Sequence, residues 1–228
     1  MNGSAQNRLS GQQRFFGIAS SVYLALSYLV GIVIFLFVLR YPEIKSAAEK
    51  VRIVTEMKSM VFLTNILMYI LFGPVLVLFI LALQSAITNS GSILARLSAI
   101  IGYIWAGSLT ASGMIANAAI DPVTRLSASN PDQAAFFWQI LDTVSMGIGN
   151  GNGEILGGLM TLGFGIVMLK EKRYGRVIGV FGIIVGAIGM LSLIPALIDM
   201  PGVFGITQLI WFIIVGVSFM RAEKGTIR

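Results

Sequence analysis

Residues 15–39 read FFGIASSVYLALSYLVGIVIFLFVL and contain no charged side chain. A helix of about 20 apolar residues is long enough to cross the hydrocarbon core of a bilayer, which is about 30 Å thick. The stretch is also longer than the apolar core of a signal peptide, which has about 7–15 residues. We therefore expect it to form a retained transmembrane helix.

Five further apolar blocks follow this one, and short polar connections separate them. The expected spans are 15–39, 61–83, 97–119, 147–169, 177–198 and 203–220. They use almost the whole chain and leave no room for a soluble domain. The sequence thus predicts an all-α, polytopic membrane bundle of about six transmembrane helices, formed as a single transmembrane domain over residues 1–228. Pro74 predicts a kink in the second span.

The composition supports a membrane protein and excludes several kinds of chemistry. Hydrophobic residues make up 56% of the chain and charged residues 11%, with a mean hydropathy of +0.87. A soluble domain carries roughly a quarter charged residues. Cysteine and histidine are absent, which excludes disulfides, thiolate nucleophiles, Cys/His zinc sites and Ser-His-Asp triads. We expect no catalytic residue, no metal and no cofactor.

The charge of the loops predicts the orientation, because Lys and Arg gather on the cytoplasmic side. With the N-terminus inside, ten basic residues are cytoplasmic: Arg8, Arg14, Arg96, Lys170, Lys172, Arg173, Arg176, Arg221, Lys224 and Arg228. Six are outside: Arg40, Lys45, Lys50, Arg52, Lys58 and Arg125. We expect both termini in the cytoplasm. The net charge of +6 follows from these separate loops, so we expect no nucleic-acid partner.

Two outer connections have helical features. Residues 40–60 predict an amphipathic helix. Its charged face is Lys45, Glu49, Arg52 and Glu56, and its other face is Ile44, Ala47, Ala48, Val51 and either Val54 or Thr55. This helix is either a solvated connector or a docking surface at the membrane interface. In the second connection, residues 121–146, Asn130 or Asp132 would cap a short helix.

Residues 147–154 read GIGNGNGE and have two interpretations. Gly149, Gly153 and Gly157 recur every four residues, which would give one helix face without side chains and allow close packing. Alternatively, so many glycines would break the helix and expose backbone groups around a polar cavity. The run does not match G-x-G-x-x-G and carries no dinucleotide-binding motif.

Polar residues within or beside spans are candidates for a functional site, because burying them in lipid is costly. The candidate polar pocket contains Asp142, Asn150, Asn152, Glu154, Thr110 and Asn117. A pair of carboxylates there would bind a cation or relay protons. The alternative is that Glu154 lies near the outer end of its span, hydrogen-bonded to polar groups or water. Stripes such as Thr110, Gly113 and Asn117 are more typical of packing seams between helices.

The order of these features resembles a known family. It begins with Arg8-Leu9-Ser10-Gly11 before the first span and Ala95-Arg96-Leu97 at the third. It continues with GGLMTLGFG at 157–165 and Arg176-Val177-Ile178-Gly179-Val180. This is similar to the six-helix bacterial membrane family catalogued as domain-of-unknown-function family 4386. The resemblance implies a bacterial inner-membrane location and brings no established activity. Members often carry a histidine near residues 146–150, and this chain has none.

Three functions remain open. The first is a non-catalytic accessory or scaffold subunit, which would partner another membrane protein or a second copy of this chain. The second is a small transporter, or a membrane protein that binds an ion or small molecule, with an outward-facing polar pocket around the fourth span. The third is an intramembrane enzyme that uses carboxylates alone, which the missing histidine and cysteine disfavour.

Overall fold

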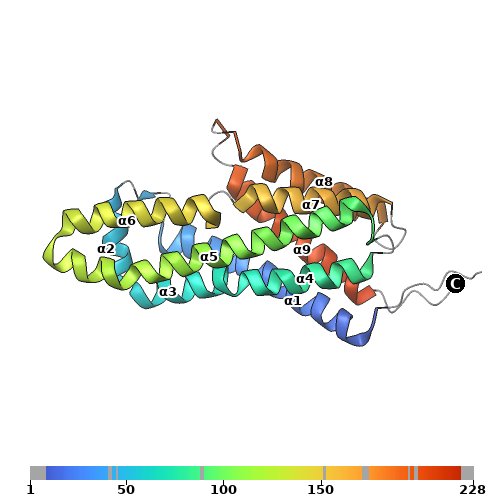
Figure 1. Cartoon of the computed structure of the whole chain (residues 1–228), viewed down its shortest axis with the longest axis horizontal. Coiled ribbons are helices and arrows are strands. Elements are labelled where there is room, and N and C mark those ends of the chain that lie inside the picture. The colour runs from blue at the N-terminus through green and yellow to red at the C-terminus, as the bar shows by residue number, and fades with distance from the viewer. Residues whose placement is uncertain are drawn as a thin grey trace, which may run out of the picture. The chain divides into compact units, whose positions relative to one another are not determined.

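The computed structural model describes residues 9–40, 43–44, 46–87, 90–150, 153–170, 175–194, 196–197 and 200–221. These residues form helices and turns and contain no strand, which confirms the predicted all-α class. The elements in chain order, where η marks a π-helical segment, are α1 (Gly11–Ile32), η1 (Val33–Val38), α2 (Ala47–Glu56), α3 (Lys58–Asn65), η3 (Ile66–Ile70), α4 (Phe72–Ala86), α5 (Ile93–Ser129), α6 (Pro131–Ser145), η4 (Met146–Asn150), α7 (Gly153–Leu169), α8 (Gly175–Leu191) and α9 (Met200–Arg221) (Figure 1).

Five helical segments of the described chain are long and apolar enough to cross a membrane. They are Gly11–Val38, Lys58–Ala86, Ile93–Ser129, Pro131–Leu169 and Met200–Arg221. The remaining expected span, 177–198, corresponds to α8, which ends at Leu191. With 17 residues, α8 is about 26 Å long. It is therefore shorter than the hydrocarbon core, and turns follow it at 192–194.

Helix α5 does not end where the sequence indicated. We expected the third span to end at about Ala119 and an outer segment to begin with Asp121-Pro122. The helix continues through Pro122 to Ser129 and has 37 residues, a length of about 55 Å. Ile120 and Val123 in this extension are fully buried against α2 and α6. Their burial offsets the backbone hydrogen bond that the proline removes.

The fourth predicted span is preceded by a helix of its own. Asn130 accepts a hydrogen bond from the backbone N–H of Gln133 at 3.1 Å and starts α6, which confirms the predicted cap. Residues 151 and 152, between η4 and α7, lie outside the described residues. Whether the glycine run forms one continuous helix or a broken one depends on these two residues, which the structure does not describe.

The chain divides into two compact units. The first comprises Met1–Ala25, Val75–Ile104 and Glu154–Arg228, and the second comprises Leu26–Pro74 and Trp105–Gly153. Helices α1, α4 and α5 contribute residues to both units.

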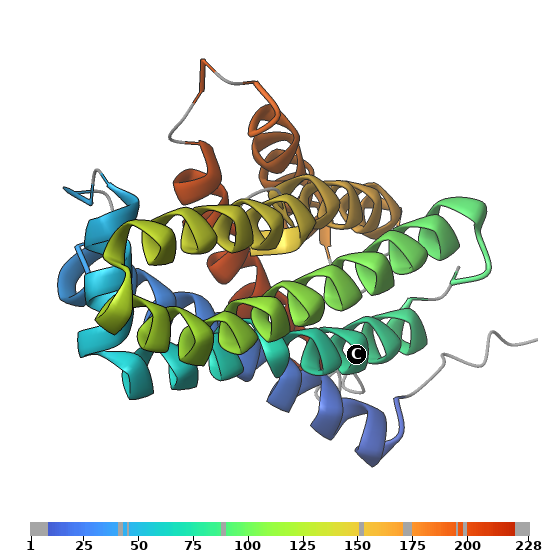
Figure 2. The same ribbon diagram turned by 60° about the vertical axis from the view of Figure 1, so that its left-hand side comes forward.

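Glycines bring α7 and α8 together in the first unit (Figure 2). A Cβ added to Gly158 would lie 2.9 Å from the Cα of Gly189. A Cβ added to Gly165 would lie 2.7 Å from the backbone nitrogen of Ile183. The two backbones thus touch where side chains are missing, as in close-packed membrane helices.

In the second unit, α2 packs against α6 and the end of α5. Val51 and Val54 of α2 are buried in this core, while Arg52 and Glu56 are exposed. A helix over Ala47–Glu56 with buried valines on one face is therefore confirmed, whereas Ala48, which was predicted on that face, is exposed, and Lys45 lies outside the described residues. Its apolar face is covered by protein, so the alternative of a free docking surface does not apply to Val51 and Val54.

Candidate binding cavity

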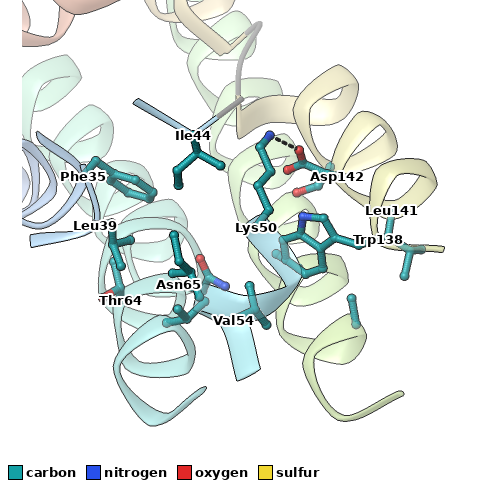
Figure 3. Close-up of a pocket in the computed structure, with 15 residues that line it drawn as sticks. Phe35, Leu39, Ile44, Lys50, Val54, Thr64, Asn65, Trp138, Leu141 and Asp142 are labelled. Carbon is teal, nitrogen blue, oxygen red and sulfur yellow. Dashed lines mark hydrogen bonds and ion pairs between the residues drawn. The ribbon is translucent and has the colours of Figure 1, made fainter. Parts of the chain in front are cut away.

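The second unit contains a cavity of about 60 Å³ between η1, α2, α3, α5 and α6 (Figure 3). Most of its walls are apolar, and Phe35, Leu39, Val54 and Leu141 are among them. A cavity needs about 10–15 Å³ on this measure to hold one water molecule. The space is therefore large enough for a short alkyl chain or the end of a longer one.

One edge of the cavity is charged. The ammonium Nζ of Lys50 on α2 lies 2.7 Å from Oδ2 of Asp142 on α6. Their side chains are 22% and 16% exposed. Each charge compensates the other in a largely dehydrated setting, so this edge is polar but close to neutral overall.

Trp138 places a free donor at the same edge. The residue is 7% exposed, and its indole Nε1–H is buried without a hydrogen-bond partner among the described residues. Figure 3 shows the ring below the Lys50–Asp142 pair, with its nitrogen on the side of that pair. Leaving such a donor unpaired costs about 1–3 kcal/mol, which favours a bound acceptor.

Asn117 supports the wall of the cavity from outside. Asn65 lines the cavity and donates from Nδ2 to Oδ1 of Asn117 at 2.9 Å. Asn117 in turn donates to the carbonyl of Phe62 at 3.2 Å. Its amide therefore holds α3 against α5 and does not line the cavity.

Thr110 has a different role again. Pro74 has no N–H and cannot donate to the carbonyl of Ile70, one helical turn earlier. The hydroxyl of Thr110 lies 3.5 Å from that carbonyl and 3.0 Å from the carbonyl of Ala106. Thr110 thus bonds mainly within its own helix, lies beside the backbone ahead of Pro74, and does not line the cavity.

Gly149 lies in a close contact, as the packing-face interpretation predicts. A Cβ there would lie 2.8 Å from the carbonyl oxygen of Ser108. One turn away, Ser112 donates to the carbonyl of Ser145 at 2.8 Å, and Ser145 donates to the carbonyl of Ser112 at 3.1 Å. Gly157 is buried in the first unit, and Gly153 begins α7.

Among the other predicted pocket residues, Glu154 does not line this cavity. Glu154 belongs to the first unit, and its Oε2 is buried without a hydrogen-bond partner among the described residues. Asn150 ends η4, and its side chain is outside the described part of the structure, as is the whole of Asn152. Of the four candidates whose side chains the structure describes, Asp142 alone is among the residues that line the cavity.

The sequence did not identify Lys50, Asn65 and Trp138 as one site. Lys50 was predicted only as a basic residue of an outer loop, and Asn65 and Trp138 were not among the candidate residues. They meet because α2 packs on α6, a tertiary contact for which no local pattern gives a signal.

Comparison with known protein families, with curated proteins and with solved structures finds no match for this chain. The described residues also contain no group of three or more His, Cys, Asp or Glu side chains that could hold a metal ion. The cavity itself has one carboxylate, already paired with a lysine. This arrangement is suited to binding.

Proposed function

We propose that this chain is a non-catalytic integral membrane protein that binds a small, mainly apolar molecule in the cavity of the second unit. The observation that carries this proposal is the unpartnered indole N–H of Trp138 beside the Lys50–Asp142 pair. Binding sites of small molecules typically combine apolar walls with a few convergent polar groups.

The ligand that fits is neutral and carries a hydrogen-bond acceptor, such as an alcohol or a carbonyl compound. An acceptor would take the hydrogen bond of Trp138, while the alkyl part would contact Phe35 and Leu39. A charged ligand would lose its hydration without gaining an unpaired counter-charge, because Lys50 and Asp142 already neutralise each other.

The membrane arrangement in this proposal has six spans, with α8 as the short one, and both termini in the cytoplasm. Support comes from the five apolar segments and from the charge of the loops. Membership of the family that the sequence resembles, and with it a bacterial inner-membrane location, is part of the same proposal.

The accessory-subunit hypothesis has less support from the packing. In that hypothesis, the glycine-rich faces of helices would be contact surfaces for a partner protein. Gly149 is instead covered by Ser108, and Gly158 and Gly165 are covered by α8 of the same chain. The cavity therefore favours the alternative of a membrane protein that binds a small molecule. The proposed site lies around α2 and α6, whereas the sequence predicted a pocket around the fourth span.

The test uses tryptophan fluorescence. The chain has three tryptophans, so the double variant Trp105→Phe/Trp211→Phe leaves Trp138 as the only reporter. In nanodiscs, butanol, butyrate and butylammonium are titrated, with butane-saturated buffer as the apolar reference. We expect butanol to change the emission of Trp138 at the lowest concentration.

The charge pair supplies a matched control. In Asp142→Asn the lysine no longer faces the carboxylate of Asp142, and we expect the preference to change to butyrate. In Lys50→Gln the carboxylate is unpaired, and we expect it to change to butylammonium. Identical titrations for all three probes and all three proteins would show only partition into the lipid and would contradict the proposal.

A further inference from the structure

The basic residues of the first unit are at the ends of five helices. They are Arg14 near the start of α1, Arg96 near the start of α5, Lys170 directly after α7, Arg176 at the start of α8 and Arg221 at the end of α9. These are all the lysines and arginines that the structure describes in this unit. Figure 1 shows the five helix ends at the same, right-hand end of the unit. We call these five residues the basic rim.

Close contacts connect the helices of the basic rim to one another. On one side, Gly163 of α7 faces Ser98 of α5, and Gly165 of α7 faces Gly179 of α8. Gly182 of α8 faces Trp211 of α9, and Gly17 of α1 faces Phe219 of α9. In addition, Arg14 donates from Nη2 to the carbonyl of Met220 at 3.2 Å. The rim thus follows a connected group of helices.

No acidic side chain among the described residues neutralises the rim. The one described acid of the first unit is Glu154, at the other end of α7 from Lys170. That separation along the helix is about 24 Å, which is beyond the Debye length of about 8 Å at physiological salt. Arg96, Lys170, Arg176 and Arg221 are exposed and form no ion pair with a described residue.

We propose that the basic rim binds the phosphate groups of anionic phospholipids in the membrane leaflet that faces it. Three of its exposed members are arginines, whose planar guanidinium groups bind phosphate oxygens with two hydrogen bonds. Helix ends that leave the bilayer place such side chains at the level of the lipid headgroups. Each lysine or arginine near an anionic membrane surface contributes a factor of about five in affinity.

The first experiment measures which lipids the full-length protein retains. The protein is reconstituted in an equal mixture of phosphatidylcholine and phosphatidylglycerol and re-extracted in mild detergent, and its bound lipids are quantified by mass spectrometry. We expect phosphatidylglycerol to be enriched over its share of the mixture. Raising the salt concentration should reduce this enrichment. Equal retention of both lipids by the wild-type protein would overturn the proposal.

Matched variants assign the lipid to the rim. Arg96→Gln/Arg176→Gln removes two rim charges, and Arg52→Gln/Arg125→Gln removes two exposed charges from the second unit. We expect the first variant to lose phosphatidylglycerol by about fivefold per charge and the second to retain it. The same loss in both variants would show a nonspecific effect of net charge and would overturn the proposal.

One further control tests whether the variants have a structural defect, and another tests whether the ligand is a lipid or free phosphate. Arg96→Lys/Arg176→Lys keeps both charges and should keep most of the enrichment, whereas a loss equal to that of the Gln variant would indicate a structural defect and count against the proposal. Inorganic phosphate and glycerol 3-phosphate are added as competitors. If either displaces phosphatidylglycerol at millimolar concentration, the rim recognises free phosphate, and the assignment to lipid is wrong.

Discussion

Lys50 on α2 and Asp142 on α6 are 92 positions apart in the chain, and their Nζ and Oδ2 atoms lie 2.7 Å apart. This ion pair fastens the amphipathic helix of the first connection onto the helix that precedes the glycine run. The pair is partly buried, so the carboxylate of Asp142 depends on Lys50 for its compensation.

The first prediction concerns the stability of this pair. Lys50→Gln or Asp142→Asn alone should lower the free energy of unfolding by about 1–3 kcal/mol, because one buried charge loses its partner. The double variant Lys50→Met/Asp142→Leu should recover most of that loss. Thermal unfolding in nanodiscs measures both effects. The matched control is the exposed pair Lys58–Asp121, whose removal should have no measurable effect.

The second prediction concerns the unpartnered donor of the cavity. Trp138→Phe removes the buried N–H together with a small part of the ring, so the free energy of unfolding should change by less than about 1 kcal/mol. The affinity for butanol should fall by about five- to tenfold, because one neutral hydrogen bond is lost. Isothermal titration in nanodiscs gives this affinity.

Trp211→Phe is the control for that experiment. Trp211 is fully buried in the first unit, and its indole N–H also has no partner among the described residues. Its replacement should leave the affinity for butanol unchanged. An equal loss of affinity in both variants would mean that butanol does not bind at Trp138.

The third prediction concerns the contact between α7 and α8. In Gly165→Ala the new methyl group would lie 2.7 Å from the backbone nitrogen of Ile183 and 2.8 Å from the carbonyl carbon of Gly182. Backbone atoms cannot rotate away, so α7 and α8 must separate, at a cost of about 1–3 kcal/mol. Thermal unfolding should detect this loss. Gly107→Ala, where nothing lies within 4 Å of the new methyl group, should be neutral or stabilising by up to about 1 kcal/mol.

The predictable part of the fold came from patterns local to each helix. Apolar blocks located the long segments, alternating charges located α2, and Asn130 marked the start of α6. Each of these signals needs only a few neighbouring residues. The end of α5 was missed because Pro122 is a strong local stop signal. It is overridden by the burial of Val123 against α2 and α6, which no local signal contains.

The residues of the candidate site were harder to predict from local patterns than the helices were. Polar residues were ranked by their position in or beside apolar spans, and this ranking included Asp142, which lines the cavity. It could not separate Thr110, which bonds to the carbonyl of Ala106, or Asn117, which supports Asn65, from residues that line a cavity. The partners of Asp142 come from a helix outside the apolar blocks, so the ranking did not include them.

The fourth prediction concerns the orientation of the chain. Because the chain has no cysteine, single cysteines report accessibility without a background signal. Asp132→Cys lies in the exposed first turn of α6, and Lys170→Cys lies exposed after α7. With both termini cytoplasmic, a membrane-impermeant maleimide should label Asp132→Cys in intact cells and Lys170→Cys only after permeabilisation. The reverse pattern would invert the orientation and place the basic rim on the outer leaflet. Labelling of both positions in intact cells would mean that the segment Pro131–Leu169 does not cross the membrane.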